Sequence, residues 1–81
     1  MPRYLFIVQN DKPAPDSTEI DLDGPEAARA MAMAEASEML RDHQGQSWPA
    51  PPWWVHVTDE RGATVCRLTV SGTAGSAIGA G

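Results

Sequence analysis

The chain is short and acidic: its 81 residues include 6 basic and 11 acidic side chains, for a net charge of −5. A chain this short forms one domain with a thin core, and its scattered cations do not suit a nucleic acid or an anionic membrane as partner. The single cysteine, Cys66, excludes an internal disulfide, and no apolar run is long enough for a signal peptide or a membrane span, so we expect a cytoplasmic protein.

The first predicted strand spans residues 3–8 and carries bulky apolar side chains on both of its faces. Tyr4, Phe6 and Val8 alternate with Leu5 and Ile7, so we expect burial on both sides of this strand. A polar, proline-rich loop separates it from a second strand predicted over residues 18–22. Six acidic residues lie between positions 11 and 26, so this second strand should form a negatively charged edge.

A helix is predicted over residues 26–41, a segment without glycine, proline or β-branched residues. Gly24 is the expected N-cap ahead of Pro25, and Asp23 with a capping box to Glu26 is the alternative. At helical spacing one side of this helix should be buried, comprising Ala28, Ala32, Met33, Ala36, Met39 and Leu40. The opposite side should carry Met31, Glu35, Glu38 and Asp42.

Residues 53–70 are predicted to form a β-hairpin after a proline-rich loop that contains Trp48, which either packs on the core or is an exposed contact. Gly62 suits a positive φ at the turn, and Asp59 can bond back to the turn backbone. The expected pairs are Trp53 with Leu68, Val55 with Cys66, and Val57 with Thr64, and a bulge at Gly62 would shift them by one residue. The other face should carry Trp54, His56, Val65 and Arg67.

These elements predict an α+β fold of order β-β-α-β-β over residues 1–70, followed by a flexible tail over residues 71–81. One helix would cover one face of a four-stranded antiparallel sheet, packing on Tyr4, Phe6, Val8, Val55, Val57, Cys66, Leu68 and Val70. The opposite face would keep an apolar patch of Leu5, Ile7, Trp54 and Val65. Because monomers seldom leave such patches open, the pattern predicts self-association through this face.

The chain resembles a family of short bacterial proteins catalogued as a domain of unknown function, which typically open M-P-R-Y-F-F-H-V. The resemblance rests on the opening residues 1–8, the acidic second strand, the E-A-A-R-A helix start at residues 26–30 and the W-x-V-x-V-T-D-E-x-G segment at residues 53–62. It covers residues 1–68 apart from the loop at 44–52, which looks like an insertion. This chain departs from the family at Ile7, where His is usual, and at Gly24-Pro25, which replace an Asp cap. The resemblance supports the fold and implies no activity.

Residue types that could carry chemistry are present, but not in a pattern that indicates a reaction. His56 and Cys66 are expected on opposite faces of the hairpin, which separates a nucleophile from its base. No spacing among His43, His56 and Cys66 matches a metal site, and the Asp21-x-Asp23-Gly24 segment lacks the remaining ligands of a calcium loop. We therefore expect no catalytic residue, no metal and no cofactor.

The sequence favours a non-catalytic protein-interaction module that forms a homo-oligomer or binds another protein. Its candidate interface residues are Leu5, Ile7, Trp48, Trp54, His56 and Val65. One alternative is an antitoxin-like or inhibitor-like regulator that presents the acidic edge at residues 16–23 to a basic protein. Another is an enzyme or ligand carrier, which would need a pocket lined by His56 and acidic side chains.

Overall fold

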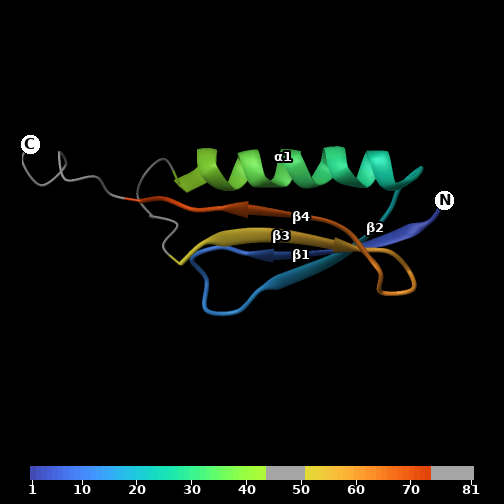
Figure 1. Ribbon diagram of the computed structural model, residues 1–81, viewed down its shortest axis with the longest axis horizontal. Helices are drawn as coiled ribbons and strands as arrows, with labels where there is room; N and C mark the ends of the chain where they lie inside the picture. Colours follow the sequence, from blue (N-terminus) through green and yellow to red (C-terminus); the bar gives the residue numbers. More distant parts are fainter. Residues whose placement is uncertain (44–50, 74–81) are drawn as a thin grey trace, which may run out of the picture.

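The computed structural model describes residues 1–43 and 51–73 and contains the predicted β-β-α-β-β order (Figure 1). Trp48 and the predicted tail residues 74–81 lie outside the described residues. The five elements are β1 (Arg3–Gln9), β2 (Asp16–Asp21), α1 (Pro25–His43), β3 (Trp53–Thr58) and β4 (Thr64–Val70). The second strand thus begins two residues earlier than predicted, and the helix extends two residues further.

The four strands form one antiparallel sheet in the order β2-β1-β3-β4. β2 and β3 are both antiparallel to β1, so they run parallel to each other with β1 between them. The chain crosses between these two strands through α1, which lies along one face of the sheet (Figure 1). We call the face that α1 covers the inner face and the opposite one the outer face.

The core lies between α1 and the inner face, and strict alternation along the strands supplies it. In β3 the odd-numbered residues Trp53, Val55 and Val57 are buried and the even-numbered residues are only half-buried. Tyr4 and Phe6 join them from β1. Full burial of each side chain of this size contributes about 1.5–3 kcal/mol. The predicted inner face is confirmed, with half-buried contributions from Val8, Cys66, Leu68 and Val70.

Helix α1 presents a different set of side chains to the sheet than predicted. Ala28 and Ala32 are fully buried, and Met31 packs against the core, whereas Met33 is 63% exposed and Leu40 is 49% exposed. The prediction was wrong for these three large side chains. At about 100° per residue, Met33 and Leu40 lie about 120–140° from Ala28, and Met31 lies only about 60° away. The helix therefore packs on a buried stripe that contains Ala28, Ala32 and Met39, with Met31 at one edge of that stripe.

The start of α1 agrees with the first of the two predicted caps. The Gly24 carbonyl oxygen accepts a hydrogen bond from the Ala28 backbone N–H at 3.1 Å, and the helix begins at Pro25. Proline is favoured at this first position because its missing N–H would have no partner within the helix. Within the described residues, no helix combines the length and the apolar character needed to cross a bilayer.

The turn of the β3–β4 hairpin has the predicted chemistry. Gly62 has a φ of +83°, and one carboxylate oxygen of Asp59 accepts the backbone N–H groups of Arg61 at 2.9 Å and Ala63 at 3.0 Å. The Asp59 carbonyl also accepts the Gly62 N–H at 3.0 Å. These bonds close the turn locally, so the two flanking strands can pair in only one register.

That register differs from the prediction by two residues. Trp53 lies opposite Val70, Val55 opposite Leu68 and Val57 opposite Cys66. A shift of two preserves which face each of these residues occupies, because side chains alternate with a period of two. One residue of this shift comes from the turn, because Thr58 pairs with Thr64, whereas the predicted pairs would place it opposite Ala63. The other comes from a bulge beside Thr58, which leaves one residue between Thr64 and Cys66.

The residue in this bulge is Val65, and its predicted place on the outer face is wrong. Val65 is half-buried and packs against the core cluster. Because a bulge places two residues opposite one, it breaks the alternation that the prediction assumed. The outer face of β4 therefore carries Arg67 and Thr69, which lie opposite His56 and Trp54.

Candidate interaction surfaces

The outer face places apolar side chains on the two central strands. Leu5 and Ile7 project from β1, and Trp54 and His56 project from β3. Ile7 lies directly opposite His56, and all four side chains are half-buried. Within residues 1–43 and 51–73, the one helix lies on the other side of the sheet, so no helix covers this face (Figure 1).

Trp54 belongs to a cluster of contacts that spans β3 and β4. The guanidinium carbon of Arg67 lies 4.6 Å from the centroid of the Trp54 ring, a cation–π arrangement. The Arg67 Nη1 atom is also 3.4 Å from Nδ1 of His56, and the Thr64 hydroxyl is 3.3 Å from Nε2 of the same ring. The sequence predicts Arg67 on this face, and the structure adds its contact with Trp54.

These contacts orient the His56 ring. One ring nitrogen, Nδ1, faces the Arg67 guanidinium group, and the other, Nε2, faces the Thr64 hydroxyl group. His56 therefore lies between two polar side chains of β4 on the outer face.

The rim of the outer face has opposite charges on its two sides. On the β2 side, Glu19 lies opposite Leu5, and Asp21 lies opposite Arg3. The Arg3 Nε atom is 3.1 Å from the Asp21 carboxylate. This hydrogen bond, together with the negative charge of Asp21, raises the pKa of Arg3, so its guanidinium group stays protonated at neutral pH. On the β4 side the rim carries the cation Arg67.

His56 and Cys66 lie on opposite faces of the sheet, as predicted. Cys66 pairs with Val57 and contributes to the core, whereas His56 faces outward. A thiol and an imidazole separated by the sheet cannot exchange a proton directly. In the described part of the chain, no three His, Cys, Asp or Glu side chains gather closely enough to hold a metal ion.

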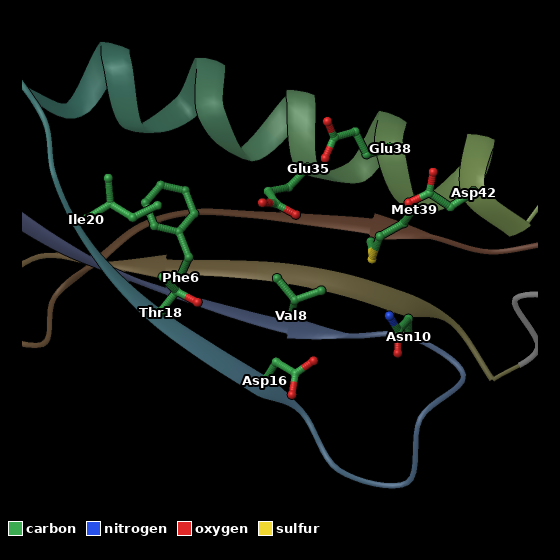
Figure 2. A pocket seen from close by; sticks show the side chains of 10 residues that line it. All are labelled: Phe6, Val8, Asn10, Asp16, Thr18, Ile20, Glu35, Glu38, Met39 and Asp42. Atoms are coloured by element: carbon green, nitrogen blue, oxygen red, sulfur yellow. The ribbon is translucent and has the colours of Figure 1, made fainter.

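A second surface lies on the inner face, beside the helix. α1 packs against β3 and β4, and a groove of about 280 Å³ remains between α1 and the strands β1 and β2. Figure 2 shows acidic side chains of α1 on one side of this groove and Asp16 of β2 on the other. We call it the acidic groove; it is lined by Phe6, Val8, Asn10, Asp16, Thr18, Ile20, Glu35, Glu38, Met39 and Asp42.

The comparisons with known proteins identify the family. The model of the domain of unknown function DUF6894 matches residues 3–71. The chain belongs to this family. No curated protein and no solved structure matches the chain.

The DUF6894 match covers all four strands and the helix. It therefore includes both candidate surfaces, the outer face and the acidic groove. The family resemblance expected from the opening residues and the late hairpin is confirmed. Because the family has no described activity, the surfaces themselves must supply any argument about function.

The acidic groove is a candidate surface that the sequence interpretation missed. Glu35, Glu38 and Asp42 were assigned to the side of the helix facing away from the sheet, but they line the groove. A comparison of the width of the sheet with that of the helix could have indicated this groove. Four strands span about 19 Å, whereas a helix with its side chains is about 10–12 Å across. One helix covers about half of such a sheet, so the charged side chains along its border lie above the remaining half.

Proposed function

We propose that this DUF6894 protein is a non-catalytic interaction module that self-associates through its outer face. The observation that supports the proposal is the grouping of Leu5, Ile7 and Trp54 on the central strands, surrounded by polar and charged side chains. An apolar centre with a polar rim is the usual anatomy of a protein–protein interface. Trp54, already oriented by Arg67, is the side chain expected to contribute most.

The size of the outer face sets the strength of the association. Four strands of about six residues give a footprint of roughly 19 by 20 Å, or about 400 Å² in projection. This is small beside the roughly 800 Å² that each partner buries in a stable complex. We therefore expect a weak, reversible dimer with a dissociation constant in the micromolar range or above.

The rim charges favour one arrangement of the two copies. A two-fold axis parallel to the strands would place β2 of one copy over β4 of the other. Glu19 would then approach Arg67 of the second copy at two symmetric places. An axis perpendicular to the strands would instead place β2 over β2 and bring like charges together, so we expect the first arrangement.

Sedimentation velocity across a concentration series tests the proposal. The wild type should show a concentration-dependent increase in sedimentation coefficient, and Trp54→Ala should remain monomeric while staying folded. Met33→Ala is the matched control, because Met33 is an exposed apolar side chain on the helix. A wild type that is monomeric at millimolar concentration, or an equal loss in both variants, contradicts the proposal.

Charge reversal tests the arrangement of the copies. Glu19→Arg and Arg67→Glu should each weaken the dimer, and the double variant should recover part of the affinity because the attraction is restored with opposite sign. Equal and additive weakening would contradict the β2-over-β4 arrangement without removing self-association itself.

A second candidate function is a regulator that binds a basic protein, as antitoxin-like domains do. It is favoured by β2, an exposed edge strand with acidic side chains at Asp16, Glu19 and Asp21. The wild type should then retain a basic nuclease that the variant with Asp16→Asn and Glu19→Gln does not. Retention by both would contradict this function.

A further inference from the structure

We propose that the acidic groove is the docking site for a basic amphipathic helix of a partner protein. The fold provides the space, because α1 packs over β3 and β4 and a groove remains between α1 and the β1–β2 side of the sheet. Phe6 is buried at the bottom of this groove, whereas Val8 of β1 and Ile20 of β2 remain half-buried. The inference is independent of self-association, since it concerns the opposite face of the sheet.

The floor of the groove is apolar and still partly accessible. Phe6 of β1 is buried beneath it and Met39 of α1 beside it, while Val8 and Ile20 remain half-buried and within reach of a partner. A helix laid in the groove would place its apolar side chains on these residues, the usual mode by which grooves bind amphipathic helices. The volume of about 280 Å³ lies at the lower end of ligand sites, so the groove has room for a few partner side chains.

The charges of the rim determine the kind of helix. Glu35, Glu38 and Asp42 line the α1 side, and no cation among the described residues forms an ion pair with any of them. On the β2 side Asp16 is paired with Lys12 at 3.3 Å, an exposed contact that a partner cation can share. Carboxylates on both sides of an apolar floor are complementary to a helix with an apolar stripe flanked by Arg or Lys.

The direct test is NMR titration of the ¹⁵N-labelled full chain with a synthetic 14-residue helix that carries a Leu stripe flanked by Arg. Amide shifts should concentrate at Val8, Ile20, Glu38 and Asp42. A peptide of the same composition in scrambled order, and one with Glu in place of Arg, should each bind at least tenfold more weakly. Shifts centred on the outer face, or equal binding of the scrambled peptide, would overturn the proposal.

Charge-matched variants separate the groove from the general negative charge. Neutralising Glu35, Glu38 and Asp42 to Gln, Gln and Asn should weaken binding about tenfold, since up to three ion pairs with the peptide would be lost. The control neutralises three acids outside the groove, Asp23, Glu26 and Glu60, and should change binding less than twofold. Equal weakening in both variants would show attraction by net charge alone and overturn the proposal.

One further measurement keeps this proposal distinct from the proposed function. Trp54→Ala, which should be monomeric, should bind the Arg-bearing peptide as tightly as the wild type. Loss of peptide binding in this variant would assign the peptide to the outer face and contradict docking in the groove. A wild type without self-association but with groove binding would remove the first proposal and leave this one intact.

Discussion

The two faces of the central strands β1 and β3 are built from alternate residues of the same short segments, yet their environments differ. On the inner face, Phe6 and Val57 lie opposite each other and are almost completely buried. On the outer face, Ile7 and His56 lie opposite each other and remain half-buried. Both pairs belong to the same antiparallel ladder, so the difference in burial comes from the helix that covers one side.

This comparison separates stability from interaction. Side chains beneath α1 lose almost all contact with water, so their substitution should lower the free energy of unfolding. Side chains on the outer face have little protein above them, so their substitution should act mainly on association. The predictions below are ordered by the size of the expected effect, and each tests this separation.

The largest effect is expected for Phe6→Ala. This change removes a ring that is 2% exposed and should cost about 3–5 kcal/mol of unfolding free energy. A small domain has a total stability of only about 5–15 kcal/mol, so the variant should be close to unfolding. Urea denaturation followed by far-UV circular dichroism measures it, with Leu5→Ala on the outer face as control. Equal losses in both variants would abolish the distinction between the faces.

A smaller loss is expected where α1 approaches the sheet. Ala32 is fully buried, so Ala32→Leu must push the helix away from the strands and should cost about 1–3 kcal/mol. Ala34→Leu is the matched control, because Ala34 is exposed on the same helix and Leu has nearly the helix propensity of Ala. Urea denaturation measures both variants. Similar midpoints would contradict a close approach of α1 to the sheet at Ala32.

The hairpin turn supports both faces equally, so Gly62→Ala should lower stability without changing association. A Cβ at Gly62 meets no atom within 4 Å, which leaves the φ of +83° as the source of the cost, about 1–2 kcal/mol. Gly62→Asn should recover part of the loss, because Asn tolerates this conformation better than Ala. A change in the dimer constant larger than twofold would show that the turn itself contributes to the interface.

The smallest effect is expected for Arg67→Ala. Loss of the cation–π contact with Trp54 should lower the free energy of unfolding by about 0.5–1 kcal/mol, the range for a pair near the protein surface. The emission of a protein whose other tryptophans are replaced by Phe should shift to longer wavelength as Trp54 becomes more hydrated. The double variant with Arg67→Ala and Trp54→Ala completes the test. If its loss of unfolding free energy equals the sum of the losses in the two single variants, the contact contributes nothing.

Local chemistry and strand alternation made much of the fold predictable. The alternation in residues 53–57 identified the inner face, and the Asp59 and Gly62 pair identified the turn. Both signals depend on neighbours in the sequence, so no knowledge of the tertiary structure was needed.

Three features depend on how elements meet in space, and the sequence interpretation missed them. The bulge at Val65 depends on how two strands close over the turn. The rotation of α1, which exposes Met33, depends on how closely the alanines approach the sheet. The acidic groove depends on the position of the helix over β3 and β4. In each case the pattern of hydrophobic residues is compatible with more than one arrangement of the elements.

The position of β1 in the sheet has a consequence for the synthesis of the chain on the ribosome. Its partner β3 lies 45 to 53 residues further along, from the pairs Gln9 with Trp54 (54 − 9) and Leu5 with Thr58 (58 − 5). At roughly 5–20 residues per second, the apolar strand waits about 2–10 s for that partner to be made. During this interval β2, with its acidic side chains, is the partner within reach, and its charge opposes pairing between nascent chains.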